Sequence, residues 1–136
     1  MQVHCLGPGT ELPVWVEALD RLAFGEPWGP LEDNELLLIL EPSAFARWRF
    51  LPVVGEAELL RLAVAPAARR QGLARRLLGA SEHLLKDQAI SELHLEVRTS
   101  NGPARALYEA LDWRFLGIRT AYYRDGEDAA LYRRDI

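Results

Sequence analysis

A strand-loop-helix pattern between residues 59 and 78 constrains the fold of this chain more than any other feature. Residues 59–64 (LLRLAV) form a short apolar run of the kind found in strands. Pro66 ends this run, because proline cannot donate to a sheet ladder. Helical spacing of apolar residues begins just after Gly72. The pattern therefore predicts a strand that leads through a short loop into a helix.

The loop 69–76 (RRQGLARR) brings positive charge to the expected start of that helix. The first N–H groups of a helix lack partners, and the helix dipole there favours an anion by about 0.3–2 kcal/mol. Gly72 has no Cβ, so a ligand can lie close to the main chain. Two interpretations remain open: a phosphate or pyrophosphate site, or a basic, solvated helix start whose glycine eases packing. The spacing matches neither a dinucleotide-binding nor a P-loop motif.

Composition limits the class of protein. A chain of 136 residues is expected to form one domain with a real core. The net charge of −4 argues against general nucleic-acid binding. The single Cys5 cannot form an internal disulfide, and the scattered histidines suggest no metal site. No apolar run approaches the roughly 20 residues that span a bilayer, and the N-terminus does not resemble a signal peptide, so we expect a cytoplasmic protein without membrane binding.

The other segments predict a mixed α/β domain over residues 1–136. Its first half is expected to hold an edge strand, a helix capped by Thr10, a short helix and two strands of an antiparallel meander. In chain order, the edge strand, the short helix and the meander strands are residues 3–6, 30–35, 36–40 and 44–54. The alternating polarity within 44–54 predicts a half-buried strand.

The second half is expected to contain a βαβ unit, another helix and a closing hairpin. The helix after Gly72 is followed by a strand at 92–98, and a right-handed crossover makes this strand parallel to the 59–64 strand. Ser100 or Asn101 can cap the next helix, and residues 113–123 and 129–133 form the hairpin. In an open sheet of this kind, ligands bind beyond the carboxyl ends of the parallel strands.

Two titratable residues are candidates for chemistry at this edge. Strand alternation places Glu96 on the face opposite Leu95 and Val97. Glu96 is either an exposed or Arg98-paired carboxylate or a general base, and a base role requires burial or a relaying water, since free glutamate has a pKa of about 4.3. Tyr108 is either a plain core residue or a proton donor brought to the site by its helix.

Three motifs resemble known acetyltransferases. Arg69-x-x-Gly72-x-Ala74 after a strand resembles the Q/R-x-x-G-x-G/A signature of the GCN5-related N-acetyltransferases, whose loop holds the pyrophosphate of acetyl-coenzyme A. Segments 95–101 (LEVRTSN) and 106–111 (ALYEAL) are similar to the ribosomal-protein-alanine N-acetyltransferases, which acetylate the N-terminal alanine of a small-subunit ribosomal protein. The match is dense from Glu58 to Tyr123. One departure is Asp112, where the family usually has the glycine that ends a helix.

The resemblance implies roles for individual residues. Glu96 falls on the proton acceptor of the family and Tyr108 on its proton donor. The positions that fall on acetyl-coenzyme A contacts are Leu62, Ala63, Val64, Arg69, Arg70, Gln71, Gly72, Leu73, Ala74, Arg75 and Asn101. Backbone N–H groups at 62–64 could polarise the thioester carbonyl if the sheet is interrupted there. Asn101 needs no ligand if it serves only as a helix cap.

Four aromatic residues are candidates for acceptor binding. Phe24 and Trp28 lie in a segment that loosely resembles the substrate loop of the family, and core anchoring is the alternative for both. Tyr122 and Tyr123 lie in a segment that resembles the region near its peptide site.

The resemblance implies acetyl transfer from acetyl-coenzyme A to the N-terminal α-amine of a protein, such as a small-subunit ribosomal protein. No suitably placed nucleophile suggests a covalent intermediate, so we expect direct attack in a ternary complex. An α-amine with a pKa near 8 is about one-tenth neutral at pH 7, which suits a weak glutamate base better than a lysine amine does. Two alternatives remain: a small-molecule amine as acceptor, and a non-catalytic coenzyme A-binding module.

Overall fold

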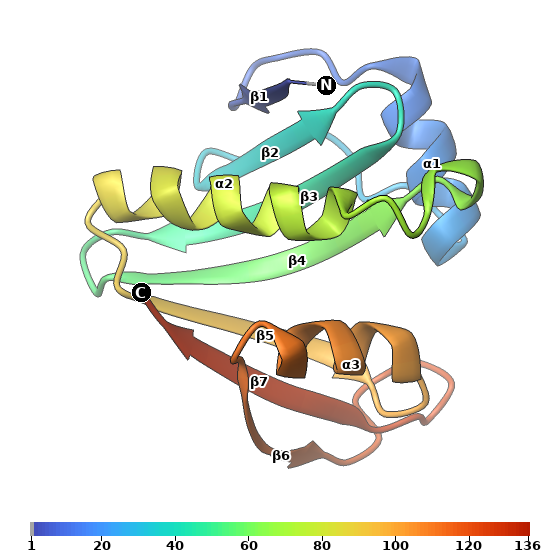
Figure 1. Ribbon diagram of the computed structural model, residues 1–136, viewed down its shortest axis with the longest axis vertical. Coiled ribbons are helices and arrows are strands. Elements are labelled where there is room, and N and C mark those ends of the chain that lie inside the picture. The colour runs from blue at the N-terminus through green and yellow to red at the C-terminus, as the bar shows by residue number, and fades with distance from the viewer. Residues whose placement is uncertain (1) are drawn as a thin grey trace.

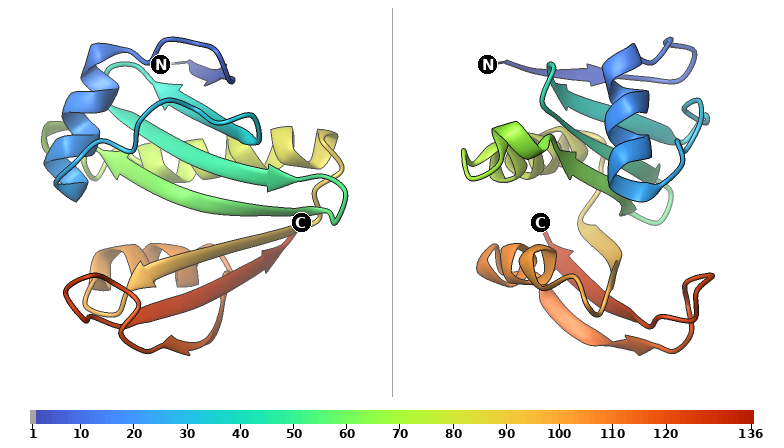
Figure 2. Two further views of the ribbon diagram at one scale, coloured as in Figure 1. Left: turned by 180° about the vertical axis from the view of Figure 1, so that it is seen from behind. Right: turned by 90° about the vertical axis from the view of Figure 1, so that its right-hand side faces the viewer.

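A seven-stranded mixed sheet in the order β1-β2-β3-β4-β5-β7-β6 forms the centre of the computed structural model, which describes residues 2–136. One helix packs on one face of the sheet and two helices pack on the other (Figures 1 and 2). The strands are β1 (Val3–Leu6), β2 (Glu35–Leu40), β3 (Ala44–Leu51), β4 (Glu56–Val64), β5 (Glu92–Arg98), β6 (Arg114–Arg119) and β7 (Ala129–Asp135). The helices are α1 (Val14–Phe24), the short 3-10 helix η1 (Pro66–Ala68), α2 (Leu73–Asp87) and α3 (Gly102–Ala110).

The predicted mixed α/β architecture is confirmed. The strands β1 to β4 form an antiparallel meander, β4 and β5 are parallel across α2, and β6 and β7 form the closing hairpin. The apolar stripe of α2 packs on the sheet, where the indole Nε1 of Trp48 donates to Ser81 Oγ at 2.9 Å. This bond satisfies two polar groups in the main core.

The strand predicted over 44–54 is confirmed as β3, but its predicted end and its half-buried pattern were wrong. β3 ends at Leu51, and its first five residues are buried on both faces. Trp48 packs into the core beneath α2, whereas Phe45 packs into the smaller core beneath α1. Arg47 is tolerated in this interior because its guanidinium pairs with buried Glu35.

Two predictions for the first half of the chain were also wrong. α1 begins at Val14 after Pro13 and has no side-chain cap, so Thr10 does not cap it. No helix forms at residues 30–35, because the guanidinium of Arg47 donates to the carbonyl oxygens of Gly29 and Pro30, at 2.7 Å each, and holds the main chain in a different path.

Among residues 2–136, no helix combines the length and the apolar character that a bilayer crossing requires.

Candidate active site

The sheet is split between β4 and β5, and this split creates the site. The two strands pair only from Glu56 opposite Glu92 to Leu59 opposite Leu95. Farther along, β4 continues against β3 and β5 continues against β7, so the halves of the sheet diverge (Figure 1). Leu60 is an extra residue in β4, because Arg47 lies opposite Arg61 while Trp48 lies opposite Leu59. Such a bulge strengthens the local twist and helps to turn β4 away from β5.

Two cavities lie on either side of this split. The α1-side cavity, of about 450 Å³, lies between α1, the ends of β4 and β5, and the loop after β6. The α2-side cavity, of about 410 Å³, lies between the start of α2 and α3. Leu62, Ala104 and Tyr108 line both. A molecule held in one cavity can therefore reach a molecule held in the other through the split.

The start of α2 gives the α2-side cavity its polar wall. Gly72 precedes the helix with a φ of 75°, a conformation that glycine adopts at little cost, and it offers no side-chain cap to the first N–H groups. A Cβ added at Gly72 would meet no atom within 4 Å, so backbone conformation rather than packing favours the glycine. The main-chain N–H groups at the helix start and the surrounding arginines form a wall suited to a diphosphate.

Most of the residues expected to contact acetyl-coenzyme A line this cavity. They are Leu62, Val64, Arg69, Arg70, Gly72, Leu73, Ala74 and Arg75. Three others do not line it. Ala63 packs into the core beneath α1, and Gln71 is exposed outside the lining. Asn101 borders the α1-side cavity instead, and its Oδ1 accepts from the Ala104 N–H at 3.2 Å, so it is the cap of α3.

An ion pair that was not predicted stabilises the part of the α1-side cavity lined by Phe24, Trp28 and Arg61, which we call its roof. Arg61 Nη1 on β4 contacts Asp20 Oδ1 on α1 at 2.7 Å, and Asp20 also accepts from the Trp28 N–H at 2.7 Å. The Arg61 guanidinium lies 4.6 Å from the ring centre of Phe24 and 4.8 Å from that of Trp28. Both aromatic residues line the cavity and are held there by the Arg61 guanidinium, so they do not serve only as core anchors.

Glu96 lies in the wall of the same cavity, on the face that strand alternation predicts. Its carboxylate contacts Arg119 Nη1 at 3.2 Å and is not paired with Arg98, which contacts Asp125 and Glu127 at 2.8 Å each. The Tyr122 hydroxyl lies beside Glu96, and hydrogen bonding to this carboxylate is the main cause that raises the pKa of Tyr122 to about 12. Tyr123 also lines the cavity, beneath the Arg98 guanidinium.

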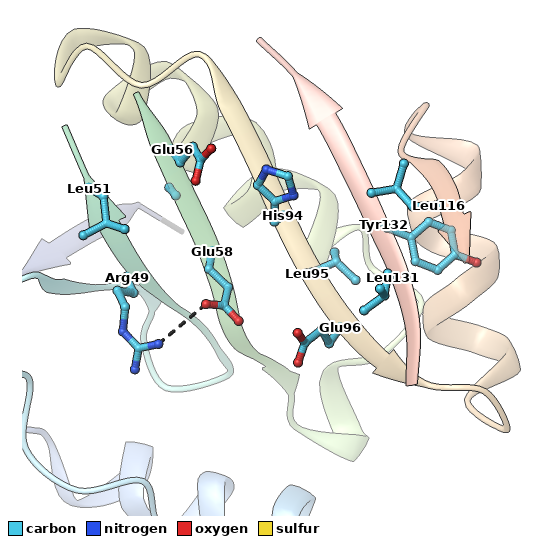
Figure 3. A pocket seen from close by; sticks show the side chains of 11 residues that line it. Arg49, Leu51, Glu56, Glu58, His94, Leu95, Glu96, Leu116, Leu131 and Tyr132 are labelled. Carbon is cyan, nitrogen blue, oxygen red and sulfur yellow. Dashed lines mark ion pairs between the residues drawn. The ribbon is translucent and has the colours of Figure 1, made fainter. Parts of the chain in front are cut away.

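Glu58 is a second carboxylate at this site, and it was missed. It lies on β4 near Glu96 of β5 (Figure 3), and both carboxylates line the α1-side cavity. Burial raises the pKa of Glu58, and the charge of Glu96 raises it further, although Arg49 opposes the shift. The strand was expected to begin at Leu59, after a turn at Gly55 and Glu56, so Glu58 was assigned to no element. The alternation of Glu56 and Glu58 with Ala57 and Leu59 was the available signal.

Tyr108 occupies the junction of the two cavities. Its ring packs near Trp113 and Tyr132 in the core, with ring centres 5.8 and 6.1 Å away. Burial raises the pKa of Tyr108 far above its ordinary value, so the phenol keeps its proton at neutral pH. Tyr108 can therefore be a core residue and a residue of the candidate site at the same time.

One cluster has ligand types that could bind a metal. Oxygen or nitrogen atoms of Glu56, Glu92 and His94 lie within 4.8 Å of one another. Glu92, however, is already paired with Arg133 and lies 2.8 Å from His94 Nε2. Glu92 and His94 therefore have partners within the protein without an ion.

Comparisons with known proteins agree with this geometry. Residues 10–113 match the family model described as acetyltransferase (GNAT) family. The N-alpha-acetyltransferase of Saccharolobus solfataricus is 38% identical over 109 residues, which are 76% of this chain and 65% of that protein. The [ribosomal protein bS18]-alanine N-acetyltransferase of Escherichia coli is 45% identical over 84 residues, 58% of this chain and 55% of that protein. The chain thus covers less than two thirds of the length of both relatives.

The fold comparison covers more of the chain. The crystal structure of the ribosomal-protein-S18-alanine N-acetyltransferase from Escherichia coli has a TM-score of 0.77 at 30% sequence identity. The superposition covers 99% of this chain and 94% of that chain.

Proposed function

Because this chain belongs to the acetyltransferase (GNAT) family, we propose that it transfers the acetyl group of acetyl-coenzyme A to the N-terminal α-amine of a protein. The names of the two relatives support an α-amine as the acceptor, since one is an N-alpha-acetyltransferase and the other a ribosomal-protein-alanine N-acetyltransferase. The N-terminus of a small-subunit ribosomal protein is therefore the first acceptor to test.

In this proposal, acetyl-coenzyme A occupies the α2-side cavity. The main-chain N–H groups at the start of α2, together with Arg70 and Arg75, hold its diphosphate. The thioester lies near Leu62 and Tyr108, where the split leaves amides of β4 without ladder partners on β5. Such amides can polarise the carbonyl. The bound coenzyme supplies an activated acetyl group that a neutral amine attacks directly.

The acceptor occupies the α1-side cavity, and two side chains move the protons. Glu96 takes a proton from the acceptor ammonium, directly or through water, so that the neutral nitrogen can form the new C–N bond. The nitrogen, positively charged once this bond has formed, loses its second proton to solvent, and as the C–S bond breaks, Tyr108 donates a proton to the departing thiolate. Tyr108 is protonated again from solvent, and the acid formed on Glu96 releases its proton there.

The observation that carries the proposal is the meeting of the two cavities at Leu62, Ala104 and Tyr108. A transferase that works by direct attack must hold donor and acceptor in separate sites that adjoin, so that the amine lies next to the thioester carbonyl. A binding module needs only the α2-side cavity, and the second cavity with its carboxylates would be unexplained.

Thiol release from acetyl-coenzyme A tests the proposal. The acceptors are peptides with free N-termini, the same peptides with blocked N-termini, and a set of polyamines and other small amines. Release with free peptides alone, together with an Nα-acetylated product in mass spectrometry, is the expected result. Release only with small amines would support the first alternative. Coenzyme binding without release for any acceptor would support a non-catalytic module.

A further inference from the structure

A third cavity continues the acceptor site across an open part of the sheet. α1 covers β2, β3 and part of β4, but in the described part of the chain, residues 2–136, no helix covers the same face of β5 and β7 (Figure 2). A groove of about 350 Å³ lies there, between the β3–β4 hairpin and β6 (Figure 3). We call it the hairpin-side groove. It shares Glu58, Leu95 and Glu96 with the α1-side cavity, so the two spaces adjoin at the carboxylate pair.

The dimensions fit the continuation of a peptide. A strand advances roughly 3.3 Å per residue, so His94 lies roughly 7 Å from Glu96 along β5. An extended acceptor has the same rise. If its amine lies beside Glu96 and its chain follows the open sheet, its third residue lies over Glu58 and His94, which lie opposite each other. Glu56 is roughly 7 Å farther along β4, within reach of a long side chain from that residue.

The walls of the groove combine apolar surface with negative charge. Leu51 and Leu116 lie at opposite sides, and both are about half exposed. Arg49 already forms ion pairs with Glu35 and Glu58, at 3.6 Å each. Glu56, in contrast, takes part in none of the ion pairs found among residues 2–136; its carboxyl group contacts that of Glu92, which itself pairs with Arg133. A long basic side chain matches this arrangement, with its charge at Glu56 and its aliphatic stem against Leu51, which lies opposite Glu56 in the β3–β4 pair.

We propose that the hairpin-side groove binds the residues that follow the acceptor N-terminus and selects arginine or lysine at the second or third position. This inference rests on the proposed function, because it assumes a polypeptide acceptor. Glu56 acts here as a specificity residue that contacts the acceptor and takes no part in proton transfer.

The test compares peptides that differ at one position. Arginine, glutamine or glutamate is placed at residue 2 or 3, and control peptides carry the same change at residue 6. We expect a KM lower by roughly three- to tenfold for arginine than for glutamine at residue 2 or 3, with kcat nearly unchanged. No such difference is expected at residue 6.

Variants of the chain assign the effect to the groove. Glu56→Gln should remove the preference for arginine, and Glu56→Lys should shift it toward glutamate. Glu17→Gln, a matched change on the exposed side of α1, should leave the preference intact. Thermal unfolding of each variant confirms that it is folded.

The possible failures can be told apart. If every peptide is acetylated and arginine gives no advantage, or if Glu56→Gln keeps the wild-type preference, the groove is not the determinant and this inference is wrong. If no peptide is acetylated, the proposed function itself fails.

Discussion

Glu58 and Glu96 lie on neighbouring strands at the point where β4 and β5 separate, and the charge of Glu96 adds to burial in raising the pKa of Glu58 (Figure 3). Each carboxylate has its own arginine, since Arg49 contacts Glu58 at 3.6 Å and Arg119 contacts Glu96 at 3.2 Å. The two groups therefore differ in their surroundings while bordering the same cavity. This arrangement offers an ammonium ion two anionic neighbours, only one of which needs to accept its proton.

Glu96→Gln should lower kcat by about two orders of magnitude or more, because general bases contribute roughly 10²–10⁴ to the rate. The KM for acetyl-coenzyme A should stay near its wild-type value, since Glu96 does not line the α2-side cavity. Glu58→Gln should act mainly on the acceptor KM. Steady-state kinetics with both substrates varied gives these constants, and wild-type turnover by Glu96→Gln would falsify the role assigned to Glu96.

Tyr108→Phe should keep the fold but lose rate. The phenyl ring retains the packing on Trp113 and Tyr132, so the thermal midpoint should change little. Loss of the proton donor should lower kcat by about 100-fold. A variant that is both stable and fully active would leave Tyr108 as a core residue only.

Gly72→Ala and Gly79→Ala should have opposite effects on stability. At Gly72 the φ of 75° disfavours alanine, so we expect a loss of about 1 kcal/mol and weaker coenzyme A binding. Gly79 lies inside α2, where a Cβ meets no atom within 4 Å, so alanine should stabilise the protein by about 1 kcal/mol. Urea unfolding and coenzyme A titration measure both effects. Equal coenzyme affinity in the two variants would argue against a diphosphate at this turn.

Asp20→Ala should destabilise the roof of the α1-side cavity. It leaves the guanidinium of Arg61 without its carboxylate and removes the acceptor of the Trp28 N–H. We expect a loss of about 3 kcal/mol in unfolding free energy. The acceptor KM should rise and the acetyl-coenzyme A KM should not. Glu17→Ala on the exposed side of the same helix is the matched control, and an equal loss in that variant would contradict this explanation.

Because of Glu127, the free energy of unfolding should depend on pH in the acidic range. Hydrogen bonds from Ser100 and Arg98 lower its pKa from 4.5 to about 2. A carboxyl group with a lowered pKa in the folded state stabilises the protein above its ordinary pKa. That contribution is lost as the pH falls from 4.5 toward 2. Urea midpoints of wild type and Glu127→Gln should therefore differ at neutral pH and converge over this interval, and a constant gap would contradict the assignment.

Local patterns in the sequence determined much of this protein. The apolar run at 59–64, Pro66 and the helical stripe after Gly72 predicted β4, its loop and α2, because alternation and helical spacing are properties of a few neighbouring residues. The same logic predicted the parallel pairing of β4 with β5 and the face on which Glu96 lies. Asn101 was also a candidate cap from sequence alone.

Tertiary structure decided how the site is assembled. The separation of β4 from β5 depends on a bulge at Leu60 and on the pairing of each strand with its other neighbour in the sheet. Neither feature can be recognised from the residues of one strand alone. The contact between Arg61 and Asp20 joins residues 41 positions apart, and Glu58 became part of the site only when β5 brought Glu96 beside it. Periodicity can assign a side chain to a face, but only packing determines which other side chains share that face. Strand pairing and ion pairs depend on contacts between segments that are far apart in the sequence, so no local pattern predicts them.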